Sequence, residues 1–353
     1  MGIRNVQRFT WGGDNAAACG QIRSSRAFFK VLLKTRNEYL LIDRWLRHYL
    51  DILGPQGQII ILDNMSTDER VFAAYQRHAD NIVLIQYDGK VDSAHSPTRF
   101  GELYAAVRES ADFYSLLDTD EFLCLYDGKS LGHSSILSFL RERREACVFP
   151  SLYLHNLYGR DDAFFFEPEG LRSYHLQGKS VLSSSAMSAF PTAPVGHNMD
   201  VPLPLFTRNA TGLVLLHMTN LSREQRIKAN MQKLVNFGIL GHERDFATVL
   251  HADESAIQPA YLRRYVHELR WLLPLEDEPA LAQSQQSRGH VTVTPDGNVH
   301  FQPPALVRDF TLHAGPGQDL LKLLSVRPPA EQPHPASANA TPPTLQQAVD
   351  QSK

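Results

Sequence analysis

Cysteine is scarce in this sequence and never occurs in a metal-binding pattern. The 353 residues contain three cysteines, Cys19, Cys124 and Cys147, which are odd in number, far apart and free of any C-x-x-C pair. A disulfide-stabilised fold would need an even set, and a structural zinc site would need closely spaced thiolates. The sequence therefore argues against both and favours a reducing compartment.

Long hydrophobic runs are also missing. No stretch approaches the roughly 18 apolar residues that a membrane-spanning helix requires. The charged residues near the start are not followed by the apolar segment of a secretory signal. We expect a soluble, cytoplasmic protein without a transmembrane segment. Peripheral membrane contact and the oligomeric state are left open by the sequence.

The charged residues show no excess of basic groups. The sum of 35 Lys and Arg against 38 Asp and Glu is a net charge of -3. Binding to the phosphate backbone of a nucleic acid is therefore not expected. Hydrophobic residues make up 43% of the chain and charged residues 21%, which is the composition of a globular protein with a large core.

Short apolar runs alternate with amphipathic stretches in the first third of the chain. Helical spacing is clearest in residues 38–53, where the apolar side chains fall on one face and the charged ones on the other. The pattern predicts strands at 27–34, 58–63, 81–87 and 113–118, and helices at 38–53, 69–79 and 98–111. This alternation predicts an α/β fold with a mostly parallel sheet and helices on both faces.

Polar side chains follow three of these strands where each strand ends. Asn37 and Glu38 follow the first strand, residues 63–68 follow the second, and residues 118–121 follow the fourth. In an open parallel sheet the carboxyl ends of the strands meet at one edge, and ligands bind there. The sequence therefore predicts a binding site of acids and amides at this edge.

The triplet Asp118-Thr119-Asp120 allows two interpretations. If the strand continues through Asp120, both carboxylates point to the same side. At about 4 Å they would then repel by about 4 kcal/mol at an effective dielectric of 20. A divalent cation would relieve this repulsion, and oxygen ligands favour Mg²⁺ or Mn²⁺. In the other interpretation, Asp118 or Asp120 caps a short helical turn through Glu121.

Taken in order, these motifs resemble those of one enzyme family. The motifs are N-E at Asn37-Glu38, D-N-x-S-T-D at 63–68 and L-D-T-D-E-F-L at 117–123. They are similar to those of GT-A glycosyltransferases of the glycosyltransferase 2 superfamily, in the group whose D-x-D is followed directly by E-F. The resemblance covers about residues 28–125. Weaker likeness continues at 178–180, at 196–198, and at His217 with residues 222–228.

The resemblance implies a fold, a reaction and a cofactor. The fold would be GT-A-like, and the reaction would move a sugar from a nucleotide-sugar, a UDP-sugar being the expected donor, to a glycan or other hydroxyl acceptor. Mn²⁺ or Mg²⁺ would be held at the D-x-D by Asp118 and Asp120, with Asp118 also facing the ribose. The nucleotide would be contacted by four further residues: Asn37, Glu38, Asp63 and Asn64. The alternative for these residues, and the commoner role for Ser66, Thr67 and Asp68, is turn and cap chemistry.

Three later residues are further candidates. His217 follows the apolar run GLVLL and resembles the histidine that completes the metal shell in the family, since neutral imidazole is a competent ligand. His197 is the alternative ligand. Lys179 would neutralise a donor phosphate as a compact charge. Their alternative roles are a structural histidine and a solvated surface lysine.

Transfer with inversion needs a general base near the acceptor hydroxyl. The family's usual acidic pair has no clean equivalent here, and Asp200 is the nearest candidate for the base. Asp161, Asp162 and Glu167 compete with it, and a retaining mechanism stays open.

Two other functions compete with sugar transfer. A metal-dependent nucleotidyltransferase would also place acids at this edge, but it would usually carry a glycine-rich phosphate loop after the first strand, and the KTRNE segment has no glycine. A catalytically inactive carbohydrate- or nucleotide-binding protein of the same fold is the other alternative. The intact Asp118 and Asp120 argue against it, and the missing base argues for it.

The chain is divided by composition and motif into four predicted parts. Residues 1–25 form an N-terminal extension; residues 26–240 form the catalytic domain, with a nucleotide-binding half at 26–125 and an acceptor half at 126–240; residues 241–325 form a helical and hairpin extension; residues 326–353 form a disordered tail. Residues 222–238 predict a helix capped by Ser222, with its basic residues on a solvated face. HVTVTPDGNVHF, at 290–301, predicts a hairpin.

Overall fold

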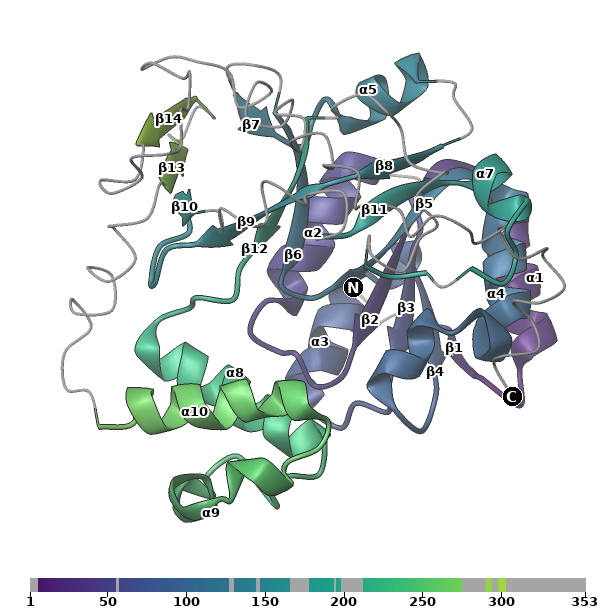
Figure 1. Ribbon diagram of the computed structural model, residues 1–353. Coiled ribbons are helices and arrows are strands. Elements are labelled where there is room, and N and C mark those ends of the chain that lie inside the picture. Colours follow the sequence, from purple (N-terminus) through teal and green to yellow (C-terminus); the bar gives the residue numbers. More distant parts are fainter. Residues whose placement is uncertain are drawn as a thin grey trace, which may run out of the picture.

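Two β-sheets with helices around them make up most of the protein (Figure 1). The structure is a computed structural model, and it describes residues 6–54, 57–126, 130–143, 147–165, 178–193, 195–197, 212–274, 290–293 and 298–302. None of the helices within these ranges is long and apolar enough to cross a membrane.

The first sheet is mostly parallel and is centred on β2. Its strands, in spatial order, are β1 (Arg8–Thr10), β4 (Ile82–Gln86), β3 (Ile59–Asp63), β2 (Ala27–Thr35), β5 (Ala111–Asp118), β11 (Ser180–Ser183) and β8 (Val148–Pro150). The first five run parallel, whereas β11 is antiparallel to β5 and to β8. The predicted α/β class, a GT-A-like and mostly parallel sheet, is confirmed.

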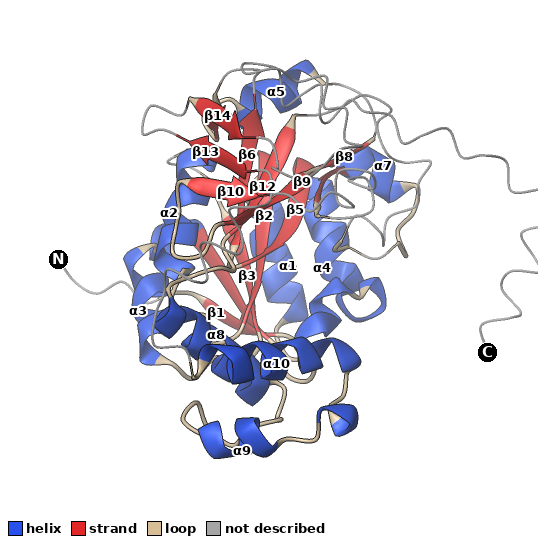
Figure 2. Cartoon of the chain, turned by 60° about the vertical axis from the view of Figure 1, so that its left-hand side comes forward, coloured by secondary structure: helices blue, strands red, loops and turns tan. Residues whose placement is uncertain are grey.

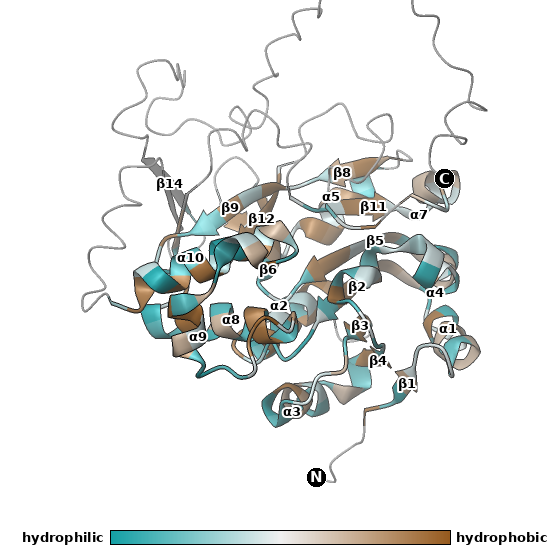
Figure 3. Ribbon diagram, turned by 60° about the horizontal axis from the view of Figure 1, so that its bottom comes forward, coloured by the Kyte–Doolittle hydropathy of each residue, from teal (hydrophilic) through white to brown (hydrophobic). Residues whose placement is uncertain are grey.

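Helices cover both faces of this sheet because successive strand residues point to opposite sides. Val31 and Leu33 of β2 belong to the core under α2 (Ile42–Leu53) and α3 (Glu69–Arg77). Leu32, between them, belongs to the core under α1 (Asn15–Ser24) and α4 (Pro97–Ser110), next to which lies α7 (Ser184–Ser188). Figure 2 shows the two helix layers on opposite sides of the strands, and Figure 3 shows hydrophobic stretches along β2 and β5 between them.

The N-terminal residues complete this architecture. β1 pairs in parallel with β4, and α1 packs against α4, so residues 8–24 extend the first sheet and its helix layer. The predicted boundary at residue 26 therefore falls inside a continuous layer of the fold.

The second sheet is mixed and follows directly from the first. Its strands, in spatial order, are β14 (Val299–Gln302), β13 (His290–Val293), β10 (Ala163–Phe165), β9 (Leu152–Asn156), β12 (Leu213–His217), β6 (Glu121–Tyr126) and β7 (Leu131–Gly132), with α5 (Ile136–Glu142) following β7 in the chain. β12 runs parallel to β9 and antiparallel to β6. Thr119 and Asp120 alone link β5 of one sheet to β6 of the other. The predicted hairpin at 290–301 is confirmed as β13 and β14.

Three helices after β12 form a separate small core. They are α8 (Arg223–Asn236), α9 (Phe246–His251) and α10 (Arg263–Leu272). Single 3₁₀ turns lie at Ala79–Asn81, Val91–His95, Glu254–Ala256 and Ala260–Leu262. The predicted serine cap is confirmed, because Ser222 and Gln225 form a reciprocal capping box at the start of α8. The predicted disordered tail, 326–353, lies outside the described residues.

Lys30 is a buried cation in the first sheet without an acidic partner among the described residues. Its side chain is fully buried, and its ammonium donates to the backbone oxygen of Ile22 and to Ser110 Oγ. Ile22 lies in the last turn of α1, where a cation is favoured by the helix dipole. Burial nevertheless lowers the pKa of Lys30 to about 8.

This depressed pKa predicts a stability that rises with pH. Between pH 8 and the ordinary lysine value near 10.5, the unfolded chain binds more protons at this residue than the folded chain, so folding gains on the order of 3 kcal/mol across that window. We expect wild type to gain stability relative to Lys30→Met between pH 7 and pH 10.5, measured by urea unfolding. Parallel pH profiles for the two proteins would contradict the prediction.

Candidate active site at the carboxyl ends of the strands

The polar strand ends converge on one edge, as the topology requires. In the sheet register Asp63 of β3 pairs with Thr35 of β2, and Asp118 of β5 pairs with Lys34 on the other side of β2. Two strand spacings of about 4.8 Å therefore separate the backbones of the two acids. This edge, from Asp63 across β2 to Asp118 and Asp120, is called the rim below.

The acidic triplet is neither a continuous strand nor a helix cap. β5 ends at Asp118, Thr119 and Asp120 form a turn, and β6 begins at Glu121. The turn is held at both ends: Thr119 Oγ1 bonds Thr35 Oγ1 at 3.1 Å, and the backbone oxygen of Asp120 accepts from Met218 N at 2.7 Å. Both expectations about the local backbone were wrong, because a junction between two sheets occupies this segment.

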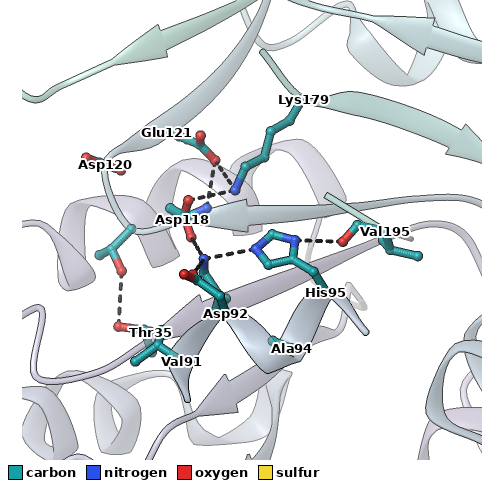
Figure 4. A network of polar contacts seen from close by, with 12 residues as sticks. Thr35, Val91, Asp92, Ala94, His95, Asp118, Asp120, Glu121, Lys179 and Val195 are labelled. Carbon is teal, nitrogen blue, oxygen red and sulfur yellow. Dashed lines mark hydrogen bonds and ion pairs between the residues drawn. The ribbon is translucent and has the colours of Figure 1, made fainter. Parts of the chain in front are cut away.

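Asp118 lies between two buried lysines, Lys34 and Lys179. Figure 4 shows Lys179 pointing toward Asp118. The Oδ1 of Asp118 is 3.2 Å from Lys34 Nζ, and its Oδ2 is 2.7 Å from Lys179 Nζ. Burial alone would raise the pKa of Asp118, but the charges of Lys179 and Lys34 outweigh it and hold the pKa well below the ordinary value. This arrangement, called the lysine clamp below, keeps Asp118 ionised at neutral pH.

Each lysine of the clamp has further partners. Lys34 Nζ also contacts Asp92 Oδ1 and His95 Nε2, both at 2.9 Å. His95 Nδ1 lies 2.7 Å from the backbone oxygen of Val195, which can only accept, so Nδ1 carries the proton and Nε2 accepts from Lys34. Burial, with Lys34 and Lys179 nearby, lowers the pKa of His95 to about 3 and keeps the ring neutral. The ammonium of Lys34 therefore has two hydrogen-bond partners, Asp92 and His95, besides its ion pair with Asp118.

Glu121 connects the clamp to the second sheet. Its buried carboxylate accepts from the backbone N–H of Asp118 at 2.7 Å, from Lys179 Nζ at 3.0 Å and from the Tyr153 hydroxyl. Lys179 itself is fully buried, which excludes the alternative of a solvated surface lysine. Glu121 thus fixes the turn and Lys179 together.

Asp120 faces His217 across the same junction. His217 Nε2 is 3.3 Å from Asp120 Oδ2, and the ring stacks on Tyr153 with centroids 4.8 Å apart. Burial raises the pKa of Asp120, but His217 outweighs it and lowers the pKa to about 2. Burial lowers the pKa of His217, and Asp120 raises it above the ordinary value. In strand register His217 pairs with Glu121 on one side and His155 on the other.

Asp120 and His217 fit a divalent ion better than Asp118 does. Neighbouring ligands of an octahedral ion at about 2.1 Å lie about 3 Å apart, close to the 3.3 Å observed between Oδ2 and Nε2. Both oxygens of Asp118 already contact ammonium groups. No cluster of three or more His, Cys, Asp or Glu placed for a metal occurs in the part of the chain that the structure describes. From the described residues a metal here would take Asp120 and His217 as ligands, with water or substrate oxygens as further ligands.

The residues expected to contact the nucleotide are engaged in turn structure. Asn37 has a left-handed φ of 52° and its Oδ1 accepts from the N–H groups of Thr67 and Asp68. Asp63 is fully buried, with Oδ1 accepting from Ser66 N at 3.0 Å and Oδ2 from Gln86 at 3.2 Å.

Asn64 and Asp68, in the segment that follows β3, are also held by hydrogen bonds. Asn64 donates to the backbone oxygens of Tyr87 and Gly89. Asp68 caps α3 by accepting from Arg70 N. These bonds hold the two loops in place, and a nucleotide contact by Asn37, Asp63 or Asn64 stays a prediction.

The carboxyl of Glu38, near the rim, has a pKa close to neutrality. Burial raises its pKa to about 7, the charge of Lys233 opposes the shift, and Asp120 and Asp118 add to it. A carboxyl that is partly ionised at neutral pH has the property required of a general acid or base.

The remaining candidates are dispersed. His197 forms an isolated β-bridge with Lys179 and its ring stacks on His95 with centroids 6.1 Å apart, while the contact to Asp120 is made by His217. Asp161 pairs with Arg44 and Asp162 with Arg160 in exposed ion pairs. Asp200 and Glu167 lie outside the described residues, so the assignment of the base to Asp200 stays a prediction.

Sequence reasoning missed Lys34, Asp92, His95 and Lys233. Lys34 could have been noticed, because it lies at the carboxyl end of a strand buried on both faces, where the sequence predicts acidic side chains that could pair with it. No sequence pattern pointed to Asp92 or His95. They lie in a short turn and come close to Lys34 only in the folded chain.

The comparisons with known proteins matched solved structures but no protein family. No family model and no curated protein matches the chain. S. aureus TarS 1-349 in complex with UDP-GlcNAc is 14% identical, covering 73% of this chain and 77% of that chain, with a TM-score of 0.34. The mannosyltransferase PcManGT from Pyrobaculum calidifontis in complex with GDP-Man and Mn²⁺ is 12% identical, covering 78% and 81%, with a TM-score of 0.36.

A third match is more partial. Glucosyl-3-phosphoglycerate synthase from Mycobacterium tuberculosis, in complex with Mn²⁺, UDP and phosphoglyceric acid, is 18% identical, covering 51% of this chain and 65% of that chain, with a TM-score of 0.27. Of these three proteins, PcManGT is the one named as a mannosyltransferase.

Proposed function

We propose that this chain is a metal-dependent glycosyltransferase that moves a sugar from a nucleotide-sugar to a hydroxyl of a glycan or other acceptor. The observation that carries the proposal is the facing pair Asp120 and His217 beside the lysine clamp on Asp118. The pair lies where an open α/β sheet binds its ligands. A UDP-sugar is the first donor to test, and GDP-mannose, named with one matched structure, is the second.

The residues at the rim would have different roles in this reaction. Asp120 and His217 would hold Mn²⁺ or Mg²⁺, which supplies a Lewis acid that offsets negative charge on the departing diphosphate. Glu121 and the lysine clamp hold the turn that carries Asp120, which places its carboxylate before a ligand arrives. His217 outweighs the effect of burial on the pKa of Asp120 and keeps the carboxylate ionised. The acceptor hydroxyl gives its proton to a general base, for which Asp200 is the predicted residue.

A donor screen with and without metal tests the proposal. Purified protein is incubated with UDP-sugars and GDP-mannose, and release of nucleoside diphosphate is followed in EDTA and in Mn²⁺. Metal-dependent release supports the proposal. Release of pyrophosphate from a nucleoside triphosphate and a sugar phosphate would instead identify a nucleotidyltransferase. Binding of nucleotide-sugars without turnover in either condition would identify an inactive binding protein.

A further inference from the structure

Helix α8 brings a lysine to the rim from a distant part of the chain. α8 begins after β12, soon after His217, and packs side by side with α10 (Figure 1). Arg226 and Glu268 form a two-bonded ion pair between these helices, at 2.7 Å for each bond. The helix is therefore held rigidly against its neighbour.

The end of α8 is also bonded to the first sheet. Asn236 Nδ2 donates to the backbone oxygen of Arg36 at 3.0 Å, and Arg36 Nη1 donates back to the oxygen of Asn236 at 3.3 Å. Arg36 directly follows β2 and precedes Asn37 and Glu38. Lys233 lies three residues before Asn236, and residues three apart share a helix face. Lys233 therefore faces the rim.

The electrostatic environment agrees with this placement. Burial raises the pKa of Glu38, Asp92, Asp118 and Asp120, and Lys233 is among the charges that oppose this effect at each of them. Lys233 is therefore within electrostatic reach of these carboxyls, in agreement with the position that the bonds of Asn236 to Arg36 give it.

Lys233 differs from the two clamp lysines in its freedom. Lys34 has three acceptors and Lys179 has two carboxylates, and both are buried. Among the described residues Lys233 has no ion pair or side-chain hydrogen bond; its recorded contact is with the ring of Phe237, 5.7 Å from the centroid. Its side chain is partly buried, whereas the side chains of Lys34 and Lys179 are buried. Lys233 is thus a cation at the rim whose donors are available to a ligand.

We propose that Lys233 is a catalytic residue that binds the diphosphate of the donor and stabilises it as it leaves. The inference rests on the proposed function and deepens it. In the reaction the bond between the anomeric carbon and the diphosphate oxygen breaks, and its electron pair stays on that oxygen. The acceptor oxygen forms the new bond to the carbon and loses its proton to the base. Negative charge grows on the diphosphate, and Lys233 donates to it there.

Lys233→Met tests the inference, with Lys228→Met as the matched control. Lys228 lies on the same helix but is exposed and pairs with Glu224. We expect Lys233→Met to lower kcat by about 10²- to 10³-fold, the range for loss of one charge-stabilising donor. Lys228→Met should turn over at the wild-type rate, and Lys233→Arg should recover part of the loss.

Binding measured by calorimetry distinguishes a catalytic role of Lys233 from a purely structural one. UDP and GDP, with UMP and GMP for comparison, are titrated into wild type and both variants in the absence of metal. Lys233→Met should bind the diphosphate that wild type prefers about tenfold more weakly, with a smaller loss for the monophosphate and an unchanged melting temperature. Equal diphosphate affinity and kcat in Lys233→Met and wild type would overturn the inference alone. A wild type that shows no metal-dependent release of nucleoside diphosphate in the donor screen would overturn the proposed function, and the inference with it.

Discussion

Asp120→Asn is expected to abolish metal-dependent turnover while the protein stays folded. The amide is isosteric with the carboxylate but neutral, so it removes the anionic ligand of the facing pair. The pKa of Asp120, raised by burial and lowered more strongly by His217 to about 2, means that wild type presents a full negative charge at neutral pH. Loss of several kcal/mol of charge stabilisation corresponds to a fall of about 10³-fold or more in kcat.

The experiment measures turnover of the best donor and Mn²⁺ binding by calorimetry, alongside thermal unfolding. Asp112→Asn is the matched control, since Asp112 lies on β5, the strand that leads into the turn of Asp120, and forms an exposed ion pair with Arg26. We expect the control to match wild type in all three measurements. Wild-type turnover by Asp120→Asn would remove the metal role assigned here to Asp120.

The first sheet could be predicted from the sequence because its signals are local. The apolar runs at 27–34, 58–63, 81–87 and 113–118 became β2, β3, β4 and β5 within two residues at each end. Their convergence at the rim follows from the rule that parallel strands share a carboxyl edge. The approach of Asp63 and Asp118 to that edge needed no knowledge of side-chain contacts.

The details of the rim depend on contacts that the local sequence does not record. The turn at Thr119-Asp120 exists because β6 leaves for a second sheet, pairing with β12 about ninety residues later. Lys179 directly precedes β11, the strand antiparallel to β5, and reaches Asp118 from there. Lys233 was assigned to a solvated helix face, because its proximity to the rim arises from the bonds of Asn236 to Arg36.

Asp118→Asn should have a different effect from Asp120→Asn, since the two acids have different neighbours. Asp118 neutralises two buried ammonium groups, and breaking a buried ion pair costs about 3–5 kcal/mol because a charge is left without compensation. Lys34 keeps Asp92, and Lys179 keeps Glu121. We therefore expect a loss at the lower end, about 3 kcal/mol of unfolding free energy at pH 7, with Mn²⁺ affinity changed far less than in Asp120→Asn.

The pH dependence supplies a second test of the clamp. Burial raises the pKa of Asp118, and Lys179 and Lys34 lower it well below its ordinary value, so the folded protein binds fewer protons here than the unfolded chain in acid. The stabilisation is complete above about pH 4, the unfolded value, and is lost as the pH falls below it. The stability gap between wild type and Asp118→Asn, measured by urea unfolding, should therefore shrink below pH 4. If Asp118→Asn unfolds like wild type yet no longer binds Mn²⁺, Asp118 is a metal ligand and the two lysines are its counterions in the metal-free state.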